Sequence, residues 1–287
     1  MVALQLFVNG IVTGCALGVV AISFSLIYST LRIFHVAHAG IYTMGGYVAY
    51  SLVMHGVPDI LALLLAMVAA AMAGAAIQVL LYQRLAARKG THLVVLIASL
   101  GLLAVIQNLL AAIYSANILQ FPGAWSGEIV NLGDGIRLTK VQFLTVIVCI
   151  LAYIGMMLFA HRTLLGKRIR AVASNPFLAE ITRLRPQAVY VYVIAIASAV
   201  VCLPGVLVPY DLGLQPYGGV TPLLTATIAM IAGGVGSITG AFLLSVAISV
   251  VQNLSLLVMP GEWSIGVTFF VFVIFMLFRP TGLFAAR

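Results

Sequence analysis

The side chains best suited to chemistry lie close together near the start of the chain. Arg32, His35 and His38 fall within seven residues. A histidine can act as an acid, a base or a metal ligand, but two histidines three residues apart without a third ligand are a weak signal for a metal. We assign no metal site. Two interpretations stay open: a broken helix that lines a pathway, which we favour for His38, and an ordinary loop between membrane spans, which we favour for Arg32.

Motifs for catalysis and energy conversion are missing from the sequence. The long apolar runs contain no Asp or Glu, whereas proton- or sodium-driven transporters usually need a carboxylate inside the membrane. His-Glu-x-x-His, Gly-x-Ser-x-Gly and the nucleotide-binding Gly-x-x-x-x-Gly-Lys-Ser/Thr do not occur, although composition does not exclude a serine–histidine hydrolase. We predict a chain that is not an enzyme and binds no cofactor itself. If it transports, another protein drives it.

Basic side chains gather in residues 161–187, which hold six of the fourteen Lys and Arg residues. Within this segment, Asn175 followed by Pro176 is typical of a helix start, and Pro186 is expected to stop the helix. Its apolar side chains would share one face: Phe177, Leu178, Ile181 and Leu184. So short a helix is marginal alone. It fits either docking into a groove on a partner or lying on anionic lipid.

The rest of the chain has the composition of a membrane protein. Only 7% of its residues are charged and 63% are apolar, whereas a soluble domain has about 25% charged residues. A helix needs about 20 apolar residues to cross a bilayer, and most uncharged runs allow this. We predict an all-α polytopic membrane protein, a single transmembrane domain over residues 1–287 with about eight membrane helices or elements. Cys15, Cys149 and Cys202 fall in apolar runs and are expected to be packing residues.

The distribution of positive charge predicts an orientation. With residues 161–187 in the cytoplasm, twelve Lys and Arg lie inside and two, Arg137 and Lys140, outside. Lys and Arg favour the cytoplasmic side of a membrane. We therefore expect the N-terminus outside and the C-terminus in the cytoplasm. The net charge of +8 is explained by this bias and not by binding to nucleic acid.

This orientation requires residues 223–258 to begin and end outside, as a hairpin whose midpoint is the glycine-rich segment 233–240. Its first arm has about 11 residues, too few for a full crossing, so a broken or re-entrant element fits best. Non-helical backbone at membrane depth must be buried in protein or line a wet cavity. The segment therefore predicts part of a translocation pathway. The alternative is a tight glycine turn on the cytoplasmic side.

Small residues recur at every fourth position in two expected spans. They are Gly10, Gly14 and Gly18, and Ala62, Ala66, Ala70 and Gly74. Such faces allow helices to approach closely. Either a partner chain or another span of the same chain could pack there.

Several stretches together resemble one family. GKRIRAVASNPFLAE (166–180) resembles the cytoplasmic coupling segment of bacterial branched-chain amino acid permeases of the ABC importer class. The stretches that resemble other parts of that family are Val8-Asn9-Gly10, Ser25-Leu26-Ile27-Tyr28, LRIFHVAHAGIYTMGGYVAY (31–50), GGVGSITGAFL (233–243) and FRPTGLF (278–284). The chain departs from the family pattern at an extra Ala39 and after Ala179, where Leu-Gly-Ile is replaced by a run ending Arg183-Leu184-Arg185.

The resemblance implies a permease domain in the bacterial plasma (inner) membrane. It implies a second related permease subunit, two cytoplasmic subunits that bind ATP and Mg, and a periplasmic or extracellular solute-binding protein. The implied activity is ATP-driven alternating access for branched-chain amino acids or a similar small polar solute such as urea or an amide. The rival class is an autonomous channel or facilitator for a small neutral solute such as urea.

Two sets of candidate site residues result. The ATPase-coupling set is Gly166, Arg170, Ala171, Asn175, Pro176, Phe177, Leu178, Ala179 and Ile181. The translocation-pathway set is His38, Gly40, Gly45, Gly233, Gly234, Gly236 and Ser237.

Overall fold

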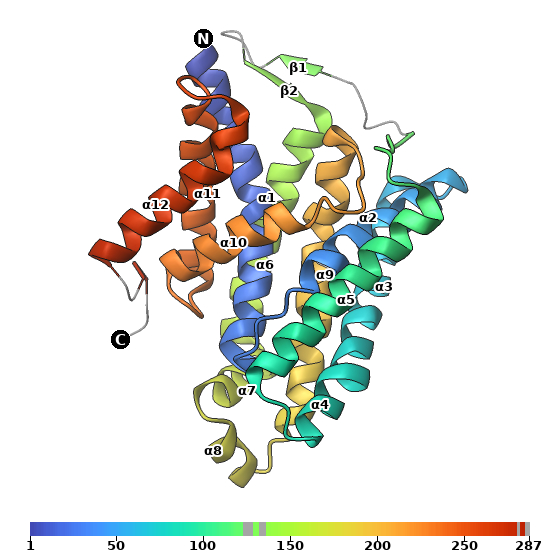
Figure 1. Cartoon of the computed structure of the whole chain (residues 1–287), viewed down its shortest axis with the longest axis vertical. Coiled ribbons are helices and arrows are strands. Elements are labelled where there is room, and N and C mark those ends of the chain that lie inside the picture. Colours follow the sequence, from blue (N-terminus) through green and yellow to red (C-terminus); the bar gives the residue numbers. More distant parts are fainter. Residues whose placement is uncertain (123–128, 132–135, 280–281, 285–287) are drawn as a thin grey trace.

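The computed structural model describes residues 1–122, 129–131, 136–279 and 282–284, which form a bundle of helices (Figure 1). The long helices are α1 (Val2–Leu31), α2 (His38–Met54), α3 (Asp59–Ile77) with its continuations η1 (Gln78–Tyr82) and α4 (Gln83–Ala87), α5 (His92–Tyr114), α6 (Lys140–Arg162), α9 (Pro186–Leu212), α10 (Val220–Gly233), α11 (Ile238–Ser255) and α12 (Ser264–Phe278). Within the described residues, seven helical stretches are long and apolar enough to cross a membrane. The all-α polytopic prediction is confirmed.

The two ends of the bundle differ in structure and in charge. The basic end carries the end of α4 and the short helices α7 (Leu164–Ser174) and α8 (Pro176–Ile181) (Figure 1). The opposite end carries the N-terminus and a two-stranded antiparallel sheet that the sequence did not predict, β1 (Ile129–Asn131) paired with β2 (Arg137–Thr139). We call this end the hairpin end after these two strands, which are distinct from the helical hairpin of α10 and α11. Gln5 fastens this sheet to α1, because its side chain bonds both the carbonyl and the N–H of Arg137, at 2.8 and 2.9 Å. Arg287, which the charge argument counted, lies outside the described residues.

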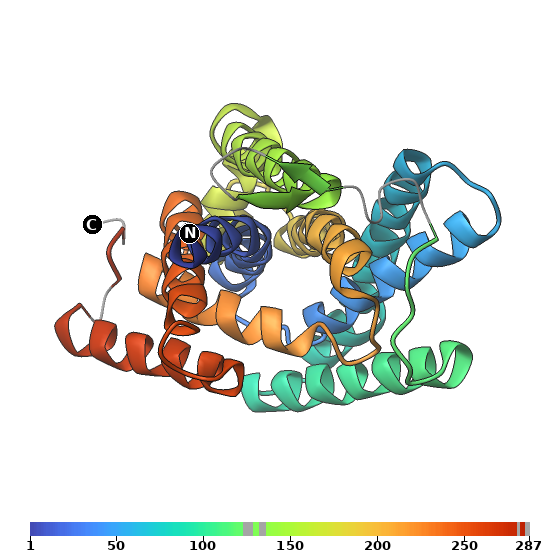
Figure 2. The same cartoon turned by 90° about the horizontal axis from the view of Figure 1, so that it is seen from above.

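Helix α1 is the central element of the bundle. Its 30 residues give a length of about 45 Å, and most side chains from Gly14 onward are buried. It packs against α6, α9, α10 and α11. Seen from above, α1 lies among α6, α9 and α11 (Figure 2). Four other long helices therefore pack directly on α1.

Both stripes of small residues pack inside this chain and not against a partner chain. A Cβ added to Gly14 would lie 2.6 Å from the Cα of Val246, and one added to Gly10 would lie 2.7 Å from the Cα of Val250, both on α11. In the second stripe, a Cβ added to Gly74 would overlap the side chain of Ser198 on α9. Lipid gives helices no hydrophobic reason to associate, so close backbone approach must supply the packing.

The predicted hairpin is present as α10 and α11. With 14 residues, α10 spans about 21 Å, which is less than the hydrocarbon core of about 30 Å. It crosses the bundle obliquely (Figure 1). The turn that follows contains Gly234 and Gly236, with φ of 101° and 87°, a backbone region that only glycine adopts readily. The glycines between the two arms are therefore required by the turn.

The segment between α1 and α2 has Arg32 exposed and His35 fully buried. The predicted extent of the helix in the basic segment was wrong. In the basic segment, α8 has only six residues and Leu184 lies beyond it. Pro186 does not merely stop that helix, since it occupies the first position of α9, where its missing N–H costs nothing.

Helix α9 continues past two internal prolines, Pro204 and Pro209, to Leu212. A proline in a helix frees the carbonyl four residues earlier. The carbonyl freed by Pro209 belongs to Gly205, and a Cβ on Gly46 of α2 would lie 2.6 Å from that oxygen. The freed group is thus buried in protein, the condition under which membrane helices tolerate proline.

Replacement of Gly14 by Ala should destabilise the protein, because the added methyl group would overlap the backbone of α11. Overpacking of this kind costs about 1–3 kcal/mol, so the thermal unfolding temperature of the detergent-purified protein should fall. Gly101→Ala on α5 is the matched control, since nothing lies within 4 Å of its added Cβ. That variant should be neutral or more stable. Equal effects of the two substitutions would contradict the close α1–α11 contact.

Candidate functional site

The segment α7–α8 forms a bent helical element at the basic end of the bundle. Thr163 caps α7 by accepting a hydrogen bond from the N–H of Gly166 at 3.0 Å. Gly166 is buried where a Cβ would meet the backbone of Ala160 on α6. Ile169 and Val172 complete the buried face of α7, and its basic side chains are exposed. The element is therefore anchored on one side and charged on the other.

The shorter helix α8 presents apolar side chains to its surroundings. The predicted cap is confirmed, because Asn175 Oδ1 accepts a hydrogen bond from the N–H of Leu178 at 3.1 Å. Phe177, Leu178 and Ile181 are 70%, 57% and 65% exposed, whereas Ala179 is buried. Of the predicted coupling set, Gly166 and Ala179 thus hold the element in place. The other seven residues are accessible: Arg170, Ala171, Asn175, Pro176, Phe177, Leu178 and Ile181.

A cavity of about 400 Å³, here called the basic-end cavity, lies between this element and the glycine turn. It is lined by Ser25 and Ser29 of α1, Arg170 of α7, and Gly236 and Ser237 of the turn. The N–H of Gly236 donates to Ser25 Oγ at 3.2 Å. Two predicted pathway residues therefore do line a cavity.

Gly233 and Gly234 instead lie beneath the C-terminal segment. The N–H groups of Leu283 and Phe284 donate to the carbonyls of Ala232 and Gly233 at 3.0 and 3.1 Å. A Cβ on Gly282 would lie 2.6 Å from the Cα of Gly234. These glycines allow two segments of backbone to meet.

The remaining predicted pathway residues pack tightly in the bundle. A Cβ on Gly40 would lie 3.1 Å from Ile106 of α5, and one on Gly45 would lie 2.5 Å from the Sγ of Cys202 on α9. His38 is fully buried and its Nε2 is 2.9 Å from Ser23 Oγ of α1. None of these three lines the cavities described in this section.

A buried polar network, which the sequence did not reveal, fixes the segment between α1 and α2. His35 Nδ1 hydrogen-bonds the hydroxyl of Tyr82. That hydroxyl donates to Ser99 Oγ at 3.0 Å, and Ser99 Oγ accepts the N–H of Ala37 at 2.9 Å. Tyr82 lies in the π-helical turn η1, which changes the direction of side chains after it. Polar groups buried in this way favour one arrangement of the backbone.

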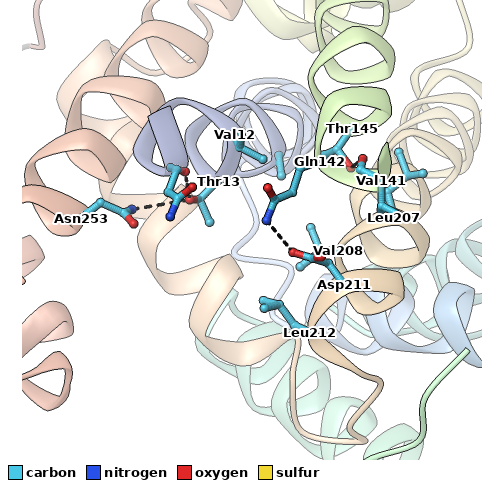
Figure 3. Close-up of a pocket in the computed structure, with 12 residues that line it drawn as sticks. Val12, Thr13, Val141, Gln142, Thr145, Leu207, Val208, Asp211, Leu212 and Asn253 are labelled. Carbon is cyan, nitrogen blue, oxygen red and sulfur yellow. Dashed lines mark hydrogen bonds between the residues drawn. The ribbon is translucent and has the colours of Figure 1, made fainter. Parts of the chain in front are cut away.

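A second cavity, the hairpin-end cavity, lies near the other end of α1 and holds about 240 Å³ (Figure 3). Its polar lining comes from four helices: Asn9 and Thr13 of α1, Gln142 and Thr145 of α6, Asp211 of α9, and Asn253 of α11. Asp211 Oδ2 accepts from Gln142 Nε2 at 2.7 Å, and Oδ1 accepts from Thr139 Oγ1 at 3.0 Å. The sequence did not single out Asp211. The Thr139-x-x-Gln142 capping box was a readable signal for the start of α6.

Metal binding finds no support in the described part of the chain. No group of three or more His, Cys, Asp or Glu side chains is placed there to hold an ion. Cys15, Cys149 and Cys202 are free thiols buried at separate places.

Seven candidate membrane spans, an amphipathic element projecting from one end and a cavity near each end define a polytopic membrane protein of the permease type. The sequence model of the family described as "Branched-chain amino acid transport system / permease component" matches residues 6–276, and the chain belongs to that family. It is therefore a membrane permease component of an ABC importer.

Relatives match over almost the whole chain. The permease protein BraD of the high-affinity branched-chain amino acid transport system of Pseudomonas aeruginosa is 27% identical, covering 98% of this chain and 95% of the relative. LivH of Salmonella typhimurium, also named as a permease of such a system, is 27% identical over 98% of this chain and 94% of its own. A chain of PsaBC from Streptococcus pneumoniae, solved in complex with Fab, aligns with a TM-score of 0.52 at 14% identity, covering 96% of this chain and 91% of that one. This last likeness concerns the fold alone.

Loss of the Ser99 hydroxyl should destabilise the bundle, because the N–H of Ala37 would remain buried without an acceptor. Such a loss costs about 1–3 kcal/mol, so we expect Ser99→Ala to lower the thermal unfolding temperature in detergent. The matched control is Ser198→Ala. Ser198 is equally buried, and its Oγ has no hydrogen-bond partner in the described structure. That control should be neutral or stabilising, and a larger loss in it than in Ser99→Ala would contradict the network.

Proposed function

We propose that this chain is one of two related permease subunits of an importer powered by two cytoplasmic ATPases and supplied by an external solute-binding protein. The cargo is a branched-chain amino acid or a chemically similar small solute. The basic end faces the cytoplasm, and α8 docks into a groove of an ATPase. The observation that carries this proposal is the apolar face of α8, held out from the bundle by an anchored α7.

The exposed face of α8 supports a protein partner. Phe177, Leu178 and Ile181 lie on a helix of six residues, and a helix so short is not stable by itself in water. Full burial of a side chain of this size stabilises a contact by about 1.5–3 kcal/mol. The flanking Lys167, Arg168 and Arg183 are exposed and would complement an acidic rim on that partner.

The lack of an energy source in the chain supports the same conclusion. The carboxylates of its candidate spans lie at helix ends (Asp59, Asp211 and Glu262), and the chain has no nucleotide-binding loop. ATP and Mg are therefore bound by the partner subunits in this proposal. Closure of the ATPases would move α8 as a rigid lever, because Gly166 fixes α7 against the backbone of α6.

The coupling role of α8 can be tested by reversing the character of its exposed face. In proteoliposomes that contain the assembled complex, Ile181→Asp should reduce ATP-driven uptake of L-leucine about tenfold, because a charge would be forced into an apolar groove. Leu164→Asp is the matched control, since Leu164 is 74% exposed but lies at the far end of α7. Unchanged uptake in Ile181→Asp would remove α8 from the ATPase contact. Uptake that needs no ATP would favour a facilitator.

The orientation can be tested by labelling in intact cells. The three native cysteines are buried, so a membrane-impermeant maleimide should react only with thiols that are introduced at the surface. We expect Arg137→Cys to be labelled in intact cells and Arg168→Cys only after permeabilisation, as the positive-inside rule predicts. The opposite pattern would reverse the orientation and contradict the proposed ATPase contact.

A further inference from the structure

The hairpin-end cavity combines one negative charge with neutral polar and apolar side chains. Among the described residues that line it, Asp211 is the sole ionisable one. The apolar part of the lining includes Val12, Val208 and Leu212. Lys140 precedes the lining residue Val141 in the chain, is exposed, and does not line the cavity. The interior of the cavity is therefore electronegative.

The position of Asp211 adds to this negative potential. It lies in the last turn of α9, where the helix dipole already places partial negative charge and disfavours a carboxylate. Its two donors, Thr139 Oγ1 and Gln142 Nε2, are neutral. They orient the carboxylate without cancelling its charge. A cation bound here would be stabilised by both the carboxylate and the helix end.

The wall opposite Asp211 is polar and uncharged. Thr13 and Asn253 lie across the cavity from Asp211 and Gln142 (Figure 3), but their donors are engaged within the protein. Thr13 Oγ1 donates to the carbonyl of Asn9, and Asn253 Nδ2 donates to the carbonyl of Ser249 at 2.9 Å and to Thr13 Oγ1 at 3.5 Å. Asn9 is engaged through its Oδ1, which accepts a hydrogen bond from Gln5 Nε2 at 2.9 Å. Its NH₂ group can therefore donate to a ligand. The two polar walls are joined by apolar side chains.

We propose that this cavity binds an amino acid with an apolar side chain, with its ammonium group on Asp211 and its carboxylate on the NH₂ group of Asn9. The inference rests on the proposed function and deepens it, because it assigns a cargo class to a particular site in the permease. A neutral solute such as urea would leave the charge of Asp211 unpaired. Sites built to pair with one polar group reject solutes that lack it.

Binding can be measured on this chain alone, without ATP. Val208→Cys places a reporter thiol on the cavity wall, and we expect L-leucine at millimolar concentration to slow its labelling by a maleimide. Neither 4-methylpentanoate, which lacks the ammonium group, nor urea should do so. In the Val208→Cys/Asp211→Asn protein, protection by L-leucine should weaken about tenfold, the loss expected for one charge-assisted hydrogen bond.

Uptake by the assembled complex separates binding from a structural role. Asp211→Asn should lower the rate of ATP-driven L-leucine uptake about tenfold at limiting substrate. Asp59→Asn is the charge control, because Asp59 is also an acid at the hairpin end, bonded by the hydroxyl of Tyr210 at 2.8 Å, and does not line the cavity. Asp59→Asn should retain uptake within about twofold. Thr139→Val removes one donor to Asp211 and the cap of α6 but keeps the carboxylate, so its loss of uptake should be smaller than that of Asp211→Asn.

Each outcome decides a different point. Equal protection by L-leucine, 4-methylpentanoate and urea, or full protection in the Asp211→Asn background, would overturn the cavity as an amino acid site. A loss in Thr139→Val as large as that in Asp211→Asn would reduce Asp211 to a structural tether. Protection by L-leucine together with no ATP-driven uptake in the wild-type complex would contradict the proposed function and leave the binding site supported.

Discussion

Close backbone contact between α1 and α11 is the interaction on which the rest of this structure depends. In hydrocarbon, lipid tails are as apolar as leucine side chains, so helices must be held together by packing and by hydrogen bonds. Gly10 and Gly14 allow α11 to approach α1 until Cα atoms of α11 occupy the space a side chain would need. Because α6, α9 and α10 also pack on α1, this contact sets the spacing of the whole bundle.

The same central helix connects the two cavities. Asn9 and Thr13 of α1 line the hairpin-end cavity, and Ser25 and Ser29 line the basic-end cavity. Between them, α1 is buried by close-packed side chains such as Val19 and Ile22, both fully inaccessible. The chain therefore holds two polar spaces separated by a closely packed stretch of α1.

The sequence predicted the spans well because their signal is local. Long uncharged runs, the Asn175-Pro176 helix start and the short glycine hairpin each depend on neighbouring residues only. Contacts between distant segments could not be predicted in this way. The bond between His35 and Tyr82 joins residues 47 positions apart and depends on a π-helical turn that has no evident sequence signal.

The roles of the candidate site residues were also hard to predict, because they depend on contacts between distant segments. Proline usually breaks a helix, but α9 continues past Pro204 and Pro209. Contact with α2 buries the carbonyl freed by Pro209, so Asp211 lies on a helix that faces a cavity. Gly40 and Gly45 were assigned to a pathway. Glycine serves close helix packing as readily as it serves a turn, and only the neighbouring atoms, Ile106 and Cys202, reveal which applies.

The two prolines of α9 have a mechanical consequence. A regular helix resists bending because each bend strains hydrogen bonds along one side. At Pro204 and Pro209 those bonds are already missing, so the packing of α2 against α9, and not the backbone alone, holds the last turns of α9 in place. Asp211 lies beyond both prolines, and its position therefore depends on that packing and on its bonds to Thr139 and Gln142.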